Sequence, residues 1–177
     1  IIACSTASGI FEKNRNYFEK KFNTPIVTML NASLSAKVNK TTKNNKIGII
    51  STSLTKQVDQ FALFLKNRKP ELLIFSNAAP LLVEQITLGN YCSKETFLIA
   101  KQYTEPLFSN NIDTLILGCT HFHFARPVLE ELCKNQIRLI EPAPIAIEHL
   151  KNLFITDYYD NSNAGIINLM VTGDVSD

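Results

Sequence analysis

Short runs of apolar residues, many of them β-branched, alternate along the chain with segments whose apolar residues recur every three or four positions. Residues 1–3 predict the end of a strand, and the other short runs predict strands at 25–30, 46–51, 70–76, 114–117, 137–140 and 168–172. The remaining segments predict helices after residue 4 and at 93–108, 127–134 and 144–153. This alternation predicts an α/β fold built from βαβ units around a mainly parallel sheet.

The segment after the strand at 46–51 has the clearest helical spacing. Val58, Phe61, Ala62 and Leu65 occupy positions i, i+3, i+4 and i+7, so they share one face of a single amphipathic helix. Before that strand, the stretch S-A-K-V-N-K-T-T-K-N-N-K spaces its four lysines evenly among polar residues, at positions 37, 40, 43 and 46. A run of this kind predicts a solvated connector.

Composition narrows the class of protein. The 177 residues suit one large domain or two small ones, and the formal charge of +2 is too small to argue for a nucleic acid or membrane partner. No window approaches the roughly 18 apolar residues of a membrane span, and no signal peptide is visible. The four cysteines, Cys4, Cys92, Cys119 and Cys133, allow two disulfides, but a chain with this much core does not need them. We expect a reduced, cytoplasmic protein.

Two cysteines occupy equivalent places in the pattern. Cys4, in I-I-A-C-S-T-A-S, and Cys119, in L-I-L-G-C-T-H-F-H-F, each follow a predicted strand and precede a predicted helix. Ligands bind at this edge of open α/β sheets. A helix N-terminus there favours a thiolate and holds a carboxylate. The loose repeat suggests two similar lobes that face each other.

Two facing thiols offer an acid on one side of a carbon and a base on the other. This arrangement suits inversion of a stereocentre, by removal of a proton from one face and its return to the other. The carbanion-like state must be stabilised by N–H groups, hydroxyls and a proton donor. No glycine-rich phosphate cradle and no convincing lysine site for pyridoxal phosphate is present, so the sequence favours a reaction without a cofactor.

Several motifs carry a family resemblance. A-C-S-T-A-S at 3–8, I-G-I-I-S-T-S-L-T at 47–55, A-P-L-L-V-E at 79–84, D-T-L-I-L-G-C-T-H-F at 113–122 and V-T-G-D-V at 171–175 resemble glutamate racemases, of the aspartate/glutamate racemase superfamily. The resemblance implies cofactor-independent interconversion of L- and D-glutamate by two bases, which supplies D-glutamate for peptidoglycan in the bacterial cytoplasm. It implies glutamate as the small-molecule partner, leaves a homodimer open, and implies no direct nucleic acid and no membrane partner.

The resemblance also implies a fold of two pseudo-symmetric Rossmann-like lobes with mainly parallel sheets. Residues 1–29 and 141–177 would form the first lobe, which is discontinuous, and 30–140 the second. The family's opening strand, with its Asp-Ser and glycine-rich turn, has no counterpart here. The first lobe is therefore expected to be incomplete at its start, the chain to be a fragment or a processed sequence, and racemisation by these 177 residues to be weak or absent.

Site residues follow from the motif positions. The resemblance makes Cys4 and Cys119 the two acid/base thiols, with His121 assisting Cys119 and Glu84 as the family's site glutamate. It implies substrate binding by the hydroxyl residues beside these motifs, which are Ser5, Thr6, Thr52, Thr55 and Thr120. Three positions depart from the family pattern. Ser5 stands in place of an asparagine and His123 in place of a proline, and Ala79 stands where the family has a cysteine, unless three residues are missing before Glu84.

Other interpretations stay open at this point. Cys119, His121 and His123 alternate, so they could ligate a metal if His149 or a carboxylate completed the set. Thr52 and Thr55 could cap a helix, and Glu84 could be a plain surface carboxylate. As a whole, the chain could be a degenerate relative that binds a partner without catalysis, or a racemase of another acidic amino acid, chiefly aspartate.

Overall fold

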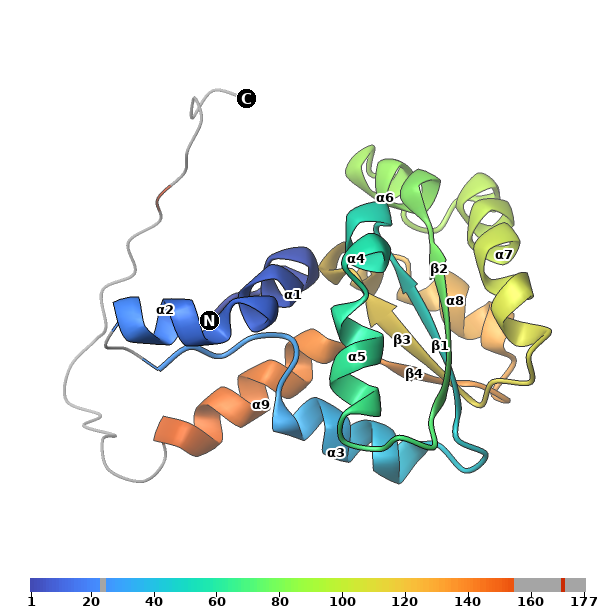
Figure 1. Cartoon of the computed structure of the whole chain (residues 1–177). Helices are drawn as coiled ribbons and strands as arrows, with labels where there is room; N and C mark the ends of the chain where they lie inside the picture. The colour runs from blue at the N-terminus through green and yellow to red at the C-terminus, as the bar shows by residue number, and fades with distance from the viewer. Residues whose placement is uncertain (23–24, 155–169, 171–177) are drawn as a thin grey trace.

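The computed structural model describes residues 1–22, 25–154 and 170. Within these residues, the strands form a four-stranded sheet of order β2-β1-β3-β4 (Figure 1). All three neighbouring pairs are parallel. The strands are β1 (Lys46–Ser51), β2 (Leu73–Ala78), β3 (Thr114–Gly118) and β4 (Arg138–Ile140). The predicted α/β fold with a parallel sheet is confirmed.

Helices surround the sheet and connect its strands (Figure 1). They are α1 (Ser5–Lys13), α2 (Arg15–Lys21), α3 (Ala32–Thr41), α4 (Ser53–Val58), α5 (Gln60–Lys66), α6 (Pro80–Thr87), α7 (Lys94–Phe108), the 3-10 helix η1 (Thr120–His123), α8 (Arg126–Cys133) and α9 (Pro142–Phe154). Among the described residues, no helix combines the length and the apolar character that crossing a membrane requires.

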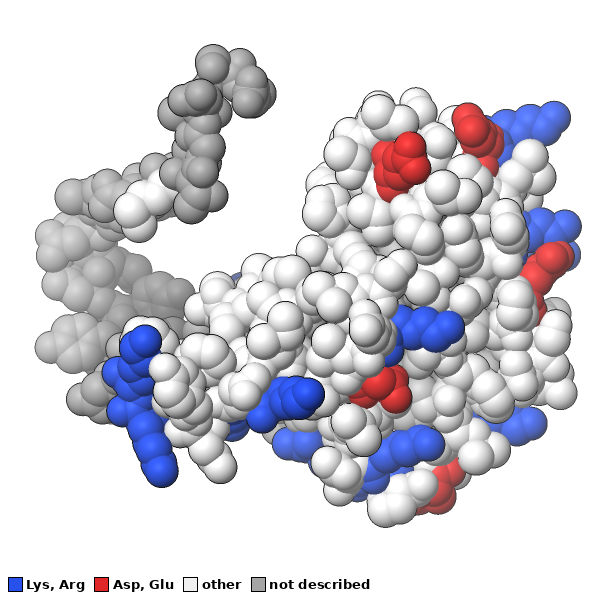
Figure 2. Space-filling model, turned by 45° about the horizontal axis from the view of Figure 1, so that its top comes forward, with Lys and Arg blue, Asp and Glu red and all other residues white. Residues whose placement is uncertain are grey.

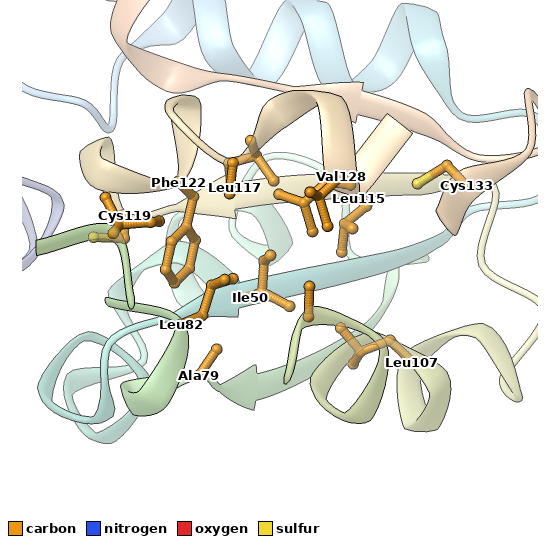
Figure 3. Packing of buried hydrophobic residues seen from close by; sticks show 14 of the residues in the cluster. Ile50, Ala79, Leu82, Leu107, Leu115, Leu117, Cys119, Phe122, Val128 and Cys133 are labelled. Carbon is orange, nitrogen blue, oxygen red and sulfur yellow. The ribbon is translucent and has the colours of Figure 1, made fainter. Parts of the chain in front are cut away.

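Alternation along the strands sends neighbouring side chains to opposite faces of the sheet. Ile50, Leu115 and Leu117 join a buried cluster with residues of α6, α7 and α8 (Figure 3). Ile49 and Ile116 belong to a second cluster, with residues of α3, α5 and α9. Both faces are therefore covered, which is the usual condition of a parallel sheet and explains why its central strands β1 and β3 are largely apolar.

The predicted lysine-rich connector is wrong over most of its length, because 32–41 form α3. Leu34 and Val38, at i and i+4, are fully buried, and the Asn31 side chain caps the helix by accepting from the Leu34 N–H at 3.0 Å. The lysines of α3 do lie on its exposed face. The helical spacing of Leu34 and Val38 thus outweighs the polar composition of the stretch.

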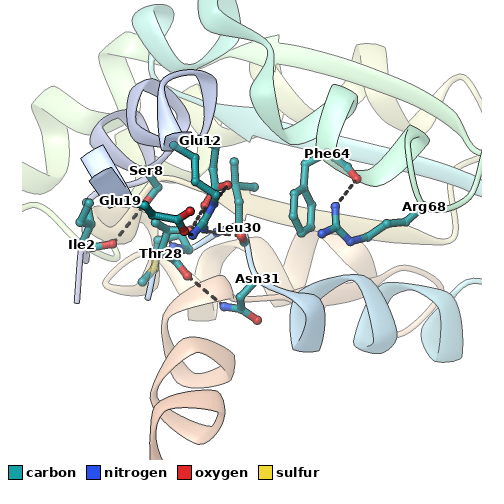
Figure 4. Close-up of polar contacts among 11 residues, drawn as sticks. Ile2, Ser8, Glu12, Glu19, Thr28, Leu30, Asn31, Phe64 and Arg68 are labelled. Atoms are coloured by element: carbon teal, nitrogen blue, oxygen red, sulfur yellow. Dashed lines mark hydrogen bonds and ion pairs between the residues drawn. The ribbon is translucent and has the colours of Figure 1, made fainter. Parts of the chain in front are cut away.

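The predicted strand at 25–30 is also wrong, since an isolated parallel bridge between Ile2 and Thr28 is the β-pairing found there. Side-chain hydrogen bonds take the place of the missing strand pairing (Figure 4). The Thr28 hydroxyl donates to Glu12 at 2.6 Å, and the Asn31 amide donates to the Thr28 carbonyl at 2.9 Å. This segment is therefore held by polar side chains rather than by sheet pairing.

Other differences are smaller. The single helix predicted around 58–65 is two helices, because Asp59 adopts a left-handed conformation with φ 50° between them. Helix α6 was not predicted, and β2 starts three residues later than the pattern indicates. The predicted strand at 168–172, apart from Met170, and the motif at 171–175 lie outside the described residues. The division into pseudo-symmetric lobes stays a prediction.

Candidate active site

Cys4 and Cys119 occupy matching positions in the structure. Cys4 follows the bridge residue Ile2 and is the N-cap of α1, with extended backbone angles of φ −89° and ψ 127°. Cys119 follows β3 and is the N-cap of η1, at φ −141° and ψ 132°. The predicted placement between a strand and a helix is therefore confirmed for Cys119, whereas Cys4 follows an isolated bridge in place of the predicted strand end. Both are free thiols, but Cys4 is exposed whereas Cys119 is 8% exposed.

The electrostatics of Cys119 link it to Cys4. Burial raises the pKa of the Cys119 thiol above the ordinary 9.0. The backbone N–H groups of His121 and Phe122 work in the opposite direction, whereas negative charge on Cys4 raises the pKa further. Cys4 is thus one of the groups whose charge acts on the Cys119 thiol, although 115 positions separate the two residues in the sequence. Because burial dominates, Cys119 holds its proton at neutral pH.

His121 lies within reach of this thiol. Its Nδ1 is 3.8 Å from the Cys119 Sγ, and its side chain is exposed to solvent. An imidazole at this distance can pass a proton between a buried thiol and water. The predicted proximity of His121 to Cys119 is thus observed, while its role in proton transfer stays a prediction.

Three predicted substrate-binding residues gather beside α1. The Thr6 hydroxyl oxygen lies 2.6 Å from that of Thr55 and 3.3 Å from that of Thr52. Thr52 is the N-cap of α4, and its hydroxyl accepts from the Thr55 N–H at 3.1 Å. The alternative prediction that these threonines cap a helix is therefore right for Thr52. The cluster joins the first turn of α1 to the first turn of α4.

Ser5 has a different environment. It is 3% exposed, and its hydroxyl has no hydrogen-bond partner among the described residues. A buried polar atom without a partner costs about 1–3 kcal/mol, which is why such atoms are rare in proteins. The predicted contact of Ser5 with substrate stays a prediction.

A cavity of about 260 Å³ opens beside Cys119. Its polar lining comes from Cys119, Thr120, His123 and Glu141. Its apolar lining comes from Leu117 of β3, from Phe124 directly after η1 and from the start of α9. His123 Nδ1 lies 2.6 Å from a Glu141 carboxylate oxygen, and Arg126 contacts the other oxygen. The motifs do not predict Glu141, although it directly follows β4 and so lies at the same sheet edge as Cys119.

Glu84 is not brought into this arrangement. It is an exposed residue of α6, and in the described part of the chain no hydrogen bond or ion pair joins it to His121. Helix α6 packs against η1, so Glu84 is on a neighbouring element without a contact to the thiol. Figure 2, which brings the top of the molecule forward, shows charged side chains dispersed over this face rather than gathered in one basic surface.

The histidines proposed as metal ligands have separate partners. His121 lies beside Cys119, His123 beside Glu141, and His149 Nδ1 lies 3.1 Å from the Ser33 hydroxyl. Across 1–22, 25–154 and 170, no group of three or more His, Cys, Asp or Glu side chains is placed to hold a metal ion. The geometry therefore gives the metal interpretation no support.

Comparison with known proteins places the chain in a family. The sequence profile described as Asp/Glu/Hydantoin racemase matches residues 1–150. Glutamate racemase of Neisseria gonorrhoeae is 35% identical over 143 residues, which cover 81% of this chain and 52% of that protein. Glutamate racemase of Stutzerimonas stutzeri is 32% identical over 155 residues, which cover 86% and 56%. The chain spans about half the length of these curated relatives.

Solved structures agree in fold. The crystal structure of glutamate racemase from Francisella tularensis in complex with D-glutamate matches with a TM-score of 0.75 and 26% identity, over 86% of this chain and 55% of that one. Glutamate racemase isoform RacE1 from Bacillus anthracis matches with a TM-score of 0.74 and 26% identity, over 88% and 59%. The profile, the sequence relatives and the fold agree with the paired cysteine segments, and the chain belongs to the Asp/Glu/hydantoin racemase family.

Proposed function

We propose that this chain carries the two-thiol centre of a cofactor-independent glutamate racemase, with Cys4 and Cys119 as opposed acid and base. The observation that carries the proposal is the placement of two free thiols, each at the N-cap of a helix. The effect of negative charge on Cys4, which raises the pKa of Cys119, supports the pairing. The choice of glutamate rests on relatives named glutamate racemase and on the related structure solved with D-glutamate. The D-glutamate produced would serve bacterial peptidoglycan synthesis.

The reaction moves one proton at a time. A Cys4 thiolate takes the Cα proton of one enantiomer, and the protonated Cys119 thiol gives its proton to the opposite face of the same carbon. The product leaves Cys4 as a thiol and Cys119 as a thiolate, so the reverse direction starts from that state. To reset the pair, Cys119 must regain a proton, and His121 at 3.8 Å is placed to supply it.

The surrounding groups would lower the energy of the carbanion-like state. The backbone N–H groups of His121 and Phe122 lower the pKa of the Cys119 thiol and so favour negative charge there. The hydroxyls of Thr6, Thr52 and Thr55 would donate to a substrate carboxylate or accept from its ammonium group. Each of these donors belongs to a helix end, which keeps it fixed before substrate arrives.

The test is Cα–H exchange in deuterium oxide. The purified protein is incubated with L-glutamate and, separately, with D-glutamate, and NMR follows loss of the Cα proton while chiral chromatography follows inversion. We expect the wild type to exchange and invert both enantiomers at a low rate, as the sequence predicts for these 177 residues. Cys4→Ala and Cys119→Ala are each expected to abolish inversion.

Cys92→Ala is the matched control, because Cys92 is an exposed free cysteine away from the paired positions. Its activity should equal that of the wild type. Full inversion by both Cys4→Ala and Cys119→Ala would rule out the two-thiol mechanism. Inversion of L-aspartate in preference to L-glutamate would identify a racemase of the other acidic amino acid, and no exchange with either would favour a non-catalytic, partner-binding role.

A further inference from the structure

Gly9 occupies an unfavourable place for its residue type. It lies in the middle of α1, where glycine is a poorer helix former than any residue except proline. Its φ is not positive, since Gly89 is the glycine with positive φ in the described part of the chain. The backbone therefore does not require glycine at this position, and the reason has to be close packing.

The packing partner is the junction of α4 and α5. A Cβ atom added to Gly9 would lie 3.3 Å from Gln60 Cβ and 3.5 Å from both Gln60 Cγ and Val58 Cγ1. Val58 and Gln60 flank Asp59, where α4 ends and α5 begins. Gly9 is buried, so a methyl at this position would move α1 and the junction apart by a few tenths of an ångström unless Gln60 gives way, and a larger side chain would move them further.

The other side of α1 is fixed as well. The Ser8 hydroxyl is completely buried, donates to the Ile2 carbonyl at 3.0 Å, and accepts from the Met29 N–H at 3.1 Å (Figure 4). A shift of α1 at Gly9 must therefore carry Cys4 with it, because Cys4 lies between Ile2 and α1. Cys119 cannot follow, since it ends a strand that pairs with β1 and β4 on its two sides.

We propose that Gly9 is a positioning residue that sets the separation of the Cys4 and Cys119 thiols by allowing close approach of α1 to the α4–α5 junction. The inference rests on the proposed two-thiol function, which gives that separation its importance. Proton transfer is steeply sensitive to distance, and a misplacement of about 1 Å can lower a rate about 100-fold.

The first measurement is the kinetics of two variants. Gly9→Ala is expected to lower kcat about 10-fold and Gly9→Val about 100-fold, with a smaller change in KM because the substrate-binding hydroxyls remain. Exchange of the Cα proton without inversion should rise relative to inversion, since one thiol still removes the proton while the other is displaced. The melting temperature of Gly9→Ala should not fall, because alanine is the better helix former.

A compensating variant separates positioning from a general packing defect. Gln60→Gly removes the atoms that a Gly9 methyl would meet, so the double variant Gly9→Ala/Gln60→Gly should recover kcat to within about 3-fold of Gln60→Gly alone. Failure of Gln60→Gly to rescue Gly9→Ala would overturn the proposed contact.

The alkylation rate of Cys119 tests the position of α1 without requiring catalytic turnover. Cys119 is nearly buried, so lifting α1 in Gly9→Val should raise its alkylation rate by iodoacetamide about 10-fold, measured by mass spectrometry of its peptide. A faster Cys119 in Gly9→Val, combined with a wild type that inverts no amino acid, would support Gly9 as a spacer and contradict the proposed function. Unchanged kcat, exchange ratio and alkylation in Gly9→Val would overturn the inference.

Discussion

Thr6 in α1 and Thr55 in α4 lie 49 positions apart in the sequence, and their hydroxyl oxygens share a hydrogen bond of 2.6 Å. Thr52 completes the cluster, with its hydroxyl donating to Thr55 at 2.9 Å. Helix α1, whose N-cap is Cys4, is therefore joined by side chains to the start of α4, the helix that follows β1. Groups that the proposed chemistry needs for substrate binding also hold the site together.

Removal of the Thr6 hydroxyl should affect both roles of this cluster. We expect Thr6→Val to lower stability by about 1 kcal/mol, because it leaves the Thr55 hydroxyl with one partner fewer, and to raise KM for glutamate. Thr6→Ser keeps the hydroxyl and should retain wild-type stability to within about 0.5 kcal/mol. Urea unfolding and steady-state kinetics measure the two effects, and equal KM for both variants would contradict the binding role.

Thiol labelling should divide the four cysteines into two pairs. Cys4 and Cys92 are exposed and should react quickly with Ellman's reagent in the native protein, whereas Cys119 and Cys133 are buried and should react slowly. Burial also raises the pKa of Cys133 to about 12, which keeps it in the unreactive thiol form. The measurement is the amplitude of the fast phase, and Cys4→Ser and Cys92→Ser should each remove half of it. Four fast thiols would contradict the described packing.

The pH dependence of Cys119 alkylation should reveal its coupling to Cys4. Burial raises the Cys119 pKa and negative charge on Cys4 raises it further, so the alkylation rate should still be rising above pH 9.0. Cys4→Ser removes that charge and should move the profile of Cys119 to lower pH, without returning it to the ordinary range, because burial is the larger cause. An unchanged profile in Cys4→Ser would mean that the two thiols do not sense each other.

Gly118 precedes Cys119 and should not tolerate a side chain. A Cβ there would lie 2.9 Å from the Ile50 carbonyl oxygen and 3.0 Å from Ser51 Cβ, on a paired strand that cannot retreat. We expect Gly118→Ala to cost about 1–3 kcal/mol in urea unfolding and to lower activity by moving Cys119. Gly48→Ala is the matched control, since its closest contact is the flexible end of Ile112, and it should cost less.

Asp113 and Asp59 should respond to acid with opposite signs. Burial opposes charge on Asp113, but the backbone N–H groups of Asn44 and Lys43 outweigh it and lower the pKa. A lowered pKa stabilises the fold above the ordinary value of 3.8, and this contribution is lost as pH falls through the folded pKa. Asp113→Asn should therefore cost at most about 1 kcal/mol at pH 7, because solvent screens this partly exposed carboxylate, and progressively less in acid, measured by denaturant unfolding at several pH values.

For Asp59, burial raises the pKa of the carboxyl, so its contribution is present below the ordinary value and is lost as pH rises through the folded pKa. Asp59→Asn should not destabilise the protein at pH 7, and asparagine also tolerates the left-handed backbone at this position. A loss of stability from Asp59→Asn equal to that from Asp113→Asn would contradict this assignment.

Much of the fold can be predicted from local patterns. The run at 46–51 is β1 over its whole length, and the helix predicted at 93–108 is α7 with Ser93 as its cap, because strand and helix periodicities there are long and uninterrupted. The segment at 25–30 fails since its apolar residues are buried by packing rather than by strand pairing, and burial alone does not specify a strand.

The site also has features that the sequence predicts and features that it does not. The positions of Cys4 and Cys119 can be predicted, because a strand end followed by a helix cap is a local feature of sequence. The pairing of Thr6 with Thr55 and of His123 with Glu141 depends on how separate segments come together, which no local pattern specifies. Glu84 shows the converse, since its motif suggests a site role, while among the described residues no hydrogen bond or ion pair joins its exposed side chain to the thiols or to His121.

The isolated Ile2–Thr28 bridge gives the two cysteines unequal mechanical support. Cys119 ends a strand with a neighbour on each side, whereas Cys4 is attached through one bridge and the side chains of α1. Local unfolding begins where backbone pairing is sparse, so warming should release Cys4 before the sheet melts. Heat inactivation would then precede loss of secondary structure and reverse on cooling.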